Sequence, residues 1–192
     1  MRIVGGSFSG RKLASLGAGA PEAQLRPTTD RVREALFNAL THGDYPPIEG
    51  ARVLDLFAGV GALGLEAISR GAVRAVFVDD HAKARALIRE NVEALSLTGQ
   101  TKIFRRDATR LGPNRGEPYD LVFLDPPYGR GLGPKALASA ANGGWISPDA
   151  VIIYELARDD EPGDLDGFEV RDDRGYGDTR ILFLRPADAT SE

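Results

Sequence analysis

Apolar runs alternate with amphipathic stretches through the middle of the chain, and this alternation restricts the fold more than any other feature. The predicted strands are 52–57, 75–78, 102–104, 119–124 and 150–155, and the predicted helices are 62–69, 82–95 and 134–141. Strands that are separated by helices join in parallel through right-handed crossovers, so that both faces of the sheet are covered. The pattern predicts an α/β domain with a mostly parallel sheet.

The two ends of the chain differ from this pattern. Residues 1–27 include a stretch rich in Gly, Ala, Ser and Pro, which is typical of a basic arm or hairpin. Thr28 or Thr29 is then expected to cap a helix that ends near Gly43. Near the C-terminus, two apolar runs flank "RDDRGYGD", which predicts an antiparallel hairpin. We therefore expect one main domain at 28–186 and a disordered tail at 187–192.

Composition excludes several classes of protein. No stretch approaches the about 20 apolar residues of a membrane span, and the N-terminus has no signal-peptide pattern. We therefore expect a cytoplasmic protein without membrane contact. The chain has no Cys and only two histidines, His42 and His81, which disfavours disulfides, thiolate nucleophiles and zinc sites. We expect no metal.

The charge of the chain is unevenly distributed, although the net charge is only −4. Residues 1–41 contain six basic and three acidic side chains, whereas residues 145–192 contain five basic and thirteen acidic ones. The N-terminal end is therefore expected to face an anion. Arginine outnumbers lysine twenty to four, but codon bias explains such an excess as readily as phosphate recognition does.

A glycine-rich loop, "LDLFAGVGALG", follows the first predicted strand. Gly59, Gly61 and Gly64 fit the G-x-G-x-x-G pattern, in which backbone N–H groups approach a ligand closely. Asp79 ends the next strand and is placed to bind ribose hydroxyls. These features suit NAD as well as any adenosine cofactor, and a plain tight turn is also possible. Asp55, just before the loop, would repel a pyrophosphate but attract a sulfonium or ammonium, which points to S-adenosyl-L-methionine.

A further carboxylate, Asp107 in "FRRDATR", follows the third predicted strand. A ligand that lies across the carboxyl ends of parallel strands would present its adenine there. The alternative is a helix N-cap, because Asp is a favoured capping residue.

The tetrapeptide Asp125-Pro126-Pro127-Tyr128 ends the fourth predicted strand. The prolines fix the backbone and lack N–H donors, which leaves carbonyls that can accept hydrogen bonds. If Asp125 and the carbonyl of Pro126 each accept one N–H of a nucleobase amine, its lone pair points at a methyl donor. Tyr128 would stack on the flipped base. A simple strand-terminating Asp-Pro turn is the alternative.

These motifs, with "GGSFSGRKL", "LRPTTDRVREALFNAL" and "FAGVGALGLEAISRGA", closely resemble the RsmD family of bacterial 16S rRNA (guanine-N2)-methyltransferases. The resemblance extends from Arg2 to about Leu184. It implies a Rossmann-like class I S-adenosylmethionine-dependent methyltransferase fold, with a seven-stranded sheet whose last strand is antiparallel. The domain at 28–186 would then be the methyltransferase domain.

The resemblance also implies roles for individual residues. According to the resemblance, Gly59 and Gly61 match the cofactor loop on the methionine side, and Asp79 matches the acid that binds the ribose. Asp107 matches the acid on the adenine side, and Asp125 to Tyr128 match the catalytic tetrapeptide. One position departs from the family pattern. His81 stands where many members have a second acid, so a supporting role there is not carried over.

In the family, the N-terminal arm and the "TTDRVR" helix lie beside the catalytic pocket. Candidates for contacts with RNA phosphates are therefore Arg11, Lys12, Arg26, Arg31 and Arg33. The alternative is ordinary solvated arginine, or an ion pair of Arg26 or Arg31 with Asp30 or Glu34. Since no separate RNA-binding domain is evident, we expect the substrate to be 16S rRNA within an assembled or assembling 30S particle. We also expect the protein to be a monomer.

The sequence thus predicts methylation of a guanine N2 amine in small-subunit rRNA, without a metal or a covalent intermediate. Three other functions remain open. Another amino-methyltransferase, acting on DNA adenine or on a protein glutamine, would keep the same motifs. An NAD-dependent oxidoreductase fits the glycines but gives Asp55 no role, and a non-catalytic ribosome-binding module has no use for an intact cofactor loop.

Overall fold

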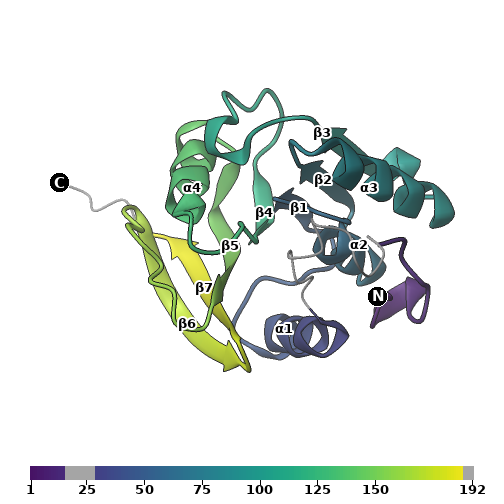
Figure 1. The fold of residues 1–192 in the computed structure, drawn as a ribbon, viewed down its shortest axis with the longest axis horizontal. Helices are drawn as coiled ribbons and strands as arrows, with labels where there is room; N and C mark the ends of the chain where they lie inside the picture. Colours follow the sequence, from purple (N-terminus) through teal and green to yellow (C-terminus); the bar gives the residue numbers. More distant parts are fainter. Residues whose placement is uncertain (16–28, 188–192) are drawn as a thin grey trace.

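A single sheet forms the centre of the protein, whose computed structural model describes residues 1–15 and 29–187 (Figure 1). Its strands are β1 (Arg52–Leu56), β2 (Arg74–Val78), β3 (Thr101–Phe104), β4 (Tyr119–Leu124), β5 (Ile146–Ala157), β6 (Phe168–Tyr176) and β7 (Thr179–Pro186). Within the described residues the sheet has seven strands, in the order β3-β2-β1-β4-β5-β7-β6. Strands β1 to β5 pair in parallel, and β7 is antiparallel to both β5 and β6. The predicted Rossmann-like class I fold is confirmed.

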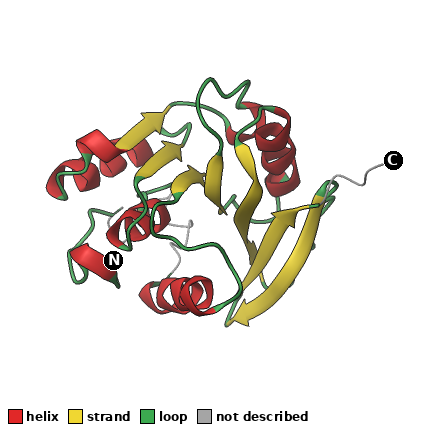
Figure 2. Cartoon of the chain, turned by 180° about the vertical axis from the view of Figure 1, so that it is seen from behind, coloured by secondary structure: helices red, strands yellow, loops and turns green. Residues whose placement is uncertain are grey.

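Helices cover both faces of the sheet. The α-helices are α1 (Asp30–His42), α2 (Ala62–Ser69), α3 (Ala82–Ala94) and α4 (Leu132–Asn142), and a 3₁₀ turn, η4, spans Ala108–Arg110. Apolar side chains of α1, α2 and α3 pack on one face, and those of α4 and η4 pack on the other. Figure 2 shows the same separation from behind, with α4 lying apart from α1 and α2. Each face of the sheet therefore has its own apolar core.

Local sequence signals account for the first helix. The hydroxyl of Thr29 accepts a hydrogen bond from the backbone N–H of Val32 at 3.3 Å, and Gly43 follows the last helical residue. Leu36, Phe37 and their apolar neighbours are buried against the sheet. Of the two threonines proposed as caps, Thr29 has this role, while Thr28 lies outside the described residues.

Three elements extend further than the sequence predicts. Helix α4 begins at Leu132 and includes Pro134. The first turn of a helix tolerates proline, because the backbone N–H groups of that turn have no acceptor within the helix. Strand β5 begins at Ile146, before an irregularity in its pairing with β4. Strand β6 continues to Tyr176 through residues that read as a turn, because an edge strand can keep polar side chains exposed.

The first fifteen residues fold back on themselves and dock on α2. The backbone N–H of Ile3 donates to the carbonyl of Arg11 at 2.9 Å, and Arg2 pairs with Lys12 in an antiparallel bridge. The buried carboxylate of Glu66 accepts the N–H groups of residues 4 and 5, each at 2.8 Å. This hairpin is therefore fixed to the domain by a side chain that is distant in sequence. Residues 16–28 and 188–192 lie outside the described part of the chain.

None of the helices in the described ranges has both the length and the apolar content that crossing a bilayer requires.

Candidate active site

The order of the strands defines where a ligand can enter. The chain runs from β1 outward to β3 and then returns to β4 on the other side of β1. In open α/β sheets, the crevice at the carboxyl ends of two such strands is the usual binding site. The register pairs Leu56 with both Val78 and Leu124, and Leu124 with Tyr154. The next residues, Asp79, Asp125 and Glu155, therefore lie at one level. Asp79 and Asp125 directly follow β2 and β4, whereas Glu155 lies within β5.

The glycine-rich loop lies at this crevice between β1 and α2. Phe57, a non-glycine residue, has a φ of +60°, and Gly59 and Gly61 have φ values of +58° and +78°. Left-handed backbone at a non-glycine residue is strained, and such strain concentrates at functional sites. A Cβ at Gly59 would meet no atom within 4 Å, so the space beside it is open to a ligand. A Cβ at Gly64 would lie 2.5 Å from Cε1 of Phe77, so α2 needs glycine there.

Two carboxylates hold this loop and the first turn of α2. Oδ2 of Asp55 accepts the N–H of Gly64 at 2.9 Å, and Asp55 is only 2% exposed. Oδ2 of Asp79 accepts the N–H of Gly59, and its Oδ1 accepts the N–H of His81, each at 2.9 Å. The carboxylates thus fix the loop while each oxygen keeps a further lone pair for a ligand.

Burial is the main cause of the unusual pKa of Asp55. It raises the pKa of Asp55 to about 8, with a further increase from the charge of Asp79 and a partial offset from the Gly64 hydrogen bond. A buried carboxylate becomes ionised readily only when a positive charge lies close to it. The open space at Gly59, the strand-end acid Asp79 and the buried acid Asp55 therefore fit a cofactor that carries both ribose hydroxyls and a cationic group.

The structure gives Asp107 the capping role that the sequence offered as an alternative. Its Oδ1 accepts both the N–H and the hydroxyl of Thr109, at 2.8 and 2.7 Å, at the start of η4. These hydrogen bonds lower the pKa of Asp107. The side chain is exposed, and its Oδ2 makes no hydrogen bond with the described residues. An additional contact with an adenine remains a prediction.

The tetrapeptide begins immediately after β4. Burial, followed by the charges of Glu155 and Asp55, raises the pKa of Asp125 well above its ordinary value. Pro126 is buried, whereas 41% of Tyr128 is exposed. The hydroxyl of Tyr128 donates to Oε1 of Glu155 at 3.1 Å. One end of the tyrosine ring is thus anchored, while much of its surface stays accessible for stacking.

Glu155 is a site residue that the sequence analysis missed. It is 3% exposed, lies in β5 beside the end of β4, and holds the hydroxyl of Tyr128. The signal that could have identified it is an acid inside an apolar strand, "VIIYEL". The same signal pointed to Asp55 in β1.

The structure separates the basic residues that were predicted to contact RNA. Arg11, Lys12 and Arg31 are exposed, and Arg11 donates to the carbonyl of Ala94 at 3.2 Å. The prediction for Arg33 is corrected, because its side chain is fully buried. It donates to Oδ1 of Asp30 at 2.7 Å and to the carbonyl of Arg2.

Arg33 therefore joins α1 to the N-terminal hairpin and cannot reach a phosphate. Arg26 lies outside the described residues.

Three adjacent residues have the geometry of a possible metal site. Within the described residues, ligand atoms of Asp79, Asp80 and His81 lie within 4.8 Å of one another. Asp80 and His81 are exposed, and exposed acidic groups commonly lie together without a metal ion. We assign no metal to this group.

Comparisons with known proteins agree with this geometry. The family model described as "Conserved hypothetical protein 95" matches residues 1–185. Ribosomal RNA small subunit methyltransferase D of Escherichia coli K12 is 41% identical over 157 residues, covering 81% of this chain and 74% of the relative. The protein of the same name from Haemophilus influenzae is 34% identical over 162 residues, covering 83% and 80%.

Solved structures extend the similarity to nearly the whole chain. The Escherichia coli protein yhhF, described as a methyltransferase, superposes with a TM-score of 0.81 at 32% identity, covering 97% of both chains. A protein from Haemophilus influenzae, described as a methylase, gives a TM-score of 0.78 at 26% identity, covering 97% of this chain and 98% of that one. The chain therefore belongs to the RsmD family, the family of ribosomal RNA small subunit methyltransferase D.

Proposed function

We propose that this protein transfers a methyl group from S-adenosyl-L-methionine to the exocyclic N2 amine of a guanine in 16S ribosomal RNA. The observation that carries the proposal is the position of the tetrapeptide beside the glycine loop. Asp125 follows β4, the glycine loop follows β1, and these two strands are neighbours in the sheet. A methyl donor in the loop and an amine at Asp125 would therefore meet in one crevice.

The cofactor, when bound, supplies a methyl group on a positively charged sulfur. Asp79 would accept hydrogen bonds from its ribose, and Asp55 would face its cationic part. The loop N–H groups are held in place by these same carboxylates, at 2.9 Å from Gly64 and Gly59. Placement of Asp107 at the adenine is part of the proposal.

The tetrapeptide would orient the amine. Asp125 and the carbonyl of Pro126 each accept a hydrogen bond from one N–H group of the amine, which directs the lone pair of the nitrogen toward the methyl carbon. The exposed ring of Tyr128 stacks on the base, a contact worth about 1–3 kcal/mol in single-strand binding. Because its hydroxyl is held by Glu155, the ring is positioned before the base arrives.

Asp125 is also suited to receive the proton that the methylated amine must lose. Positive charge develops on the nitrogen as the new bond forms, and a nearby carboxylate stabilises it. Burial and neighbouring acids raise the pKa of Asp125, which makes it a stronger base than an ordinary aspartate. We therefore assign it both the orienting role and the proton acceptor role.

The exposed cations at the N-terminal side support an RNA substrate. Arg11, Lys12 and Arg31 are available to phosphates, and the relatives named above are called ribosomal RNA methyltransferases. We include in the proposal that the enzyme acts as a monomer on an assembled or assembling 30S particle.

The test is methyl transfer from labelled S-adenosylmethionine to small-subunit particles from cells that lack the endogenous enzyme, followed by nucleoside analysis. We expect labelled N2-methylguanosine. Label in a protein amide of the particles, or in DNA supplied as a separate acceptor, with none in the RNA, would assign the protein to another class of amino-methyltransferase.

The variant Asp125→Ala tests the mechanism within the same assay. Turnover should fall nearly to background, because the variant lacks both the acceptor and the base. S-adenosylhomocysteine affinity, measured by calorimetry, should remain close to that of the wild type. Near wild-type turnover would remove Asp125 from the mechanism.

A further inference from the structure

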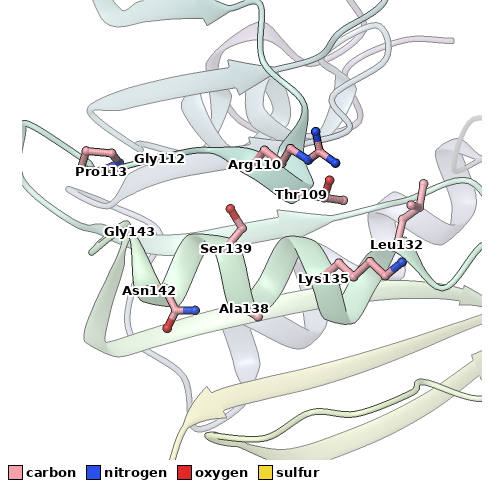
Figure 3. Close-up of a pocket in the computed structure, with 10 residues that line it drawn as sticks. All are labelled: Thr109, Arg110, Gly112, Pro113, Leu132, Lys135, Ala138, Ser139, Asn142 and Gly143. Atoms are coloured by element: carbon pink, nitrogen blue, oxygen red, sulfur yellow. The ribbon is translucent and has the colours of Figure 1, made fainter.

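A groove separates α4 from the segment that follows β3. Figure 3 shows residues from the two walls: Thr109, Arg110, Gly112 and Pro113 come from the segment around η4, and Leu132, Lys135, Ala138, Ser139, Asn142 and Gly143 come from α4 and its end. Its volume is about 760 Å³. The hydroxyl of Ser139 accepts the N–H of Leu111 at 2.9 Å, which holds the two walls together.

The groove is positively charged. Arg110 and Lys135 line it from opposite walls, are both exposed, and make no side-chain hydrogen bond or ion pair with the described residues. No lining residue is acidic. The nearby carboxylate of Asp107 accepts two hydrogen bonds from Thr109, and the charge of Arg110 adds to the lowering of its pKa, but Asp107 does not line the groove. An anion in the groove would therefore meet two available cations.

The groove leads away from the catalytic edge of the sheet. Thr109 is two residues beyond Asp107, and Leu132 is four residues beyond Tyr128, so short chain segments connect this end of the groove to both motifs. Its other end, at Gly112 and Gly143, lies past the C-terminus of α4. A chain that enters the catalytic crevice could continue along this path.

We propose that this groove binds the sugar-phosphate backbone of the RNA strand next to the target nucleotide. Arg110 and Lys135 pair with phosphates, while the exposed amide of Asn142 is available to sugar or phosphate oxygens. The inference rests on the proposed function and adds a second RNA contact to it. The N-terminal hairpin packs with α2 on one face of the sheet, and α4 covers the other. The strand thus crosses the carboxyl ends of β1 and β4 between two basic surfaces.

The salt dependence of binding provides the test. The full-length double variant Arg110→Gln/Lys135→Gln is compared with the matched control Arg89→Gln/Lys102→Gln, which removes two exposed cations from α3 and β3. Affinity for small-subunit particles is measured at several salt concentrations. Each lost phosphate contact lowers the slope of log K against log salt by roughly 0.7–0.9, so the groove variant should lose about 1.4–1.8 from its slope. The control should keep the wild-type slope.

Two results would overturn the proposal while the wild type still methylates the RNA. The first is an unchanged slope in the groove variant. The second is weaker binding of S-adenosylhomocysteine with unchanged RNA binding, which would assign the groove to the adenine end of the cofactor. If the wild type methylates no RNA, the proposed function fails, and the RNA groove fails with it.

Discussion

Replacing Asp55 with Asn tests why a carboxylate is buried under the cofactor loop. Asn has nearly the same shape, and its carbonyl can still accept the N–H of Gly64 that now bonds to Oδ2 at 2.9 Å. Its amide donors resemble the proton of a neutral aspartic acid. The substitution therefore removes the charge and changes little else.

The expected effect on stability follows from the pKa of Asp55. Burial raises it from 3.8 to about 8, so the folded protein binds a proton more tightly at this site than the unfolded chain does. Stability is therefore lost as pH rises from about 4 to about 8, at up to about 1.4 kcal/mol per pH unit. The full penalty is on the order of 5 kcal/mol above pH 8. Asp55→Asn escapes this penalty.

Urea unfolding of the wild type and of Asp55→Asn, at pH 5.0 and at pH 7.5, measures this penalty. The free energy of unfolding of Asp55→Asn should exceed that of the wild type by about 3 kcal/mol more at pH 7.5 than at pH 5.0. If the free energies of unfolding of the two proteins change in parallel with pH, Asp55 does not have a raised pKa and the reasoning is refuted.

The same variant should bind the cofactor less well, although it is more stable. A cationic ligand favours the ionised form of Asp55, so wild-type binding near pH 7 should release a proton. Calorimetry in buffers of different ionisation enthalpy detects that release, which Asp55→Asn should lack. If only S-adenosylmethionine loses affinity, Asp55 faces the sulfonium; if S-adenosylhomocysteine loses it equally, Asp55 faces the ammonium.

Two further substitutions test separate parts of the structure. Glu155→Gln keeps an acceptor for the tyrosine hydroxyl but removes a charge that raises the pKa of Asp125, so the acid limb of the kcat/KM profile should shift to lower pH. An unmoved limb would show that Asp125 does not control it. Gly6→Ala should destabilise the fold by more than about 1 kcal/mol in urea unfolding, because the new Cβ would lie 1.9 Å from the carbonyl oxygen of Ser69 at a φ of +76°. Wild-type stability would mean that the hairpin does not dock as described.

The sequence predicts the elements whose signals are local. The apolar runs of β1, β2 and β4, the cap at Thr29 and the glycine loop are all evident from nearby residues. Because the carboxyl ends of parallel strands coincide, the positions of Asp79 and Asp125 at the ends of two apolar runs are enough to place both residues at one edge of the sheet.

Features that depend on distant partners could not be predicted. Glu66 is a fully buried helical acid that pairs with Arg70 one turn later, but it also accepts the N–H groups of residues 4 and 5, which nothing near it in sequence indicates. Arg33 is misassigned for the same reason, since one of its partners, the carbonyl of Arg2, lies 31 positions away. The amide of Asn91 likewise links Ala14 to the loop residue Val60.

The distribution of charge explains how one site could treat a cofactor and an RNA differently. Asp55, Asp79, Asp125 and Glu155 gather at the crevice, where the mutual repulsion that helps to raise the pKa of Asp55 and Asp125 favours a cation and disfavours a phosphate. The available cations lie outside it, in the N-terminal hairpin with α1 and along the groove at α4. A polynucleotide could then insert only its uncharged part, the base, while its phosphates stay on the flanks. Under the proposed function, the acids that destabilise the protein thus also prevent the RNA backbone from entering the cofactor site.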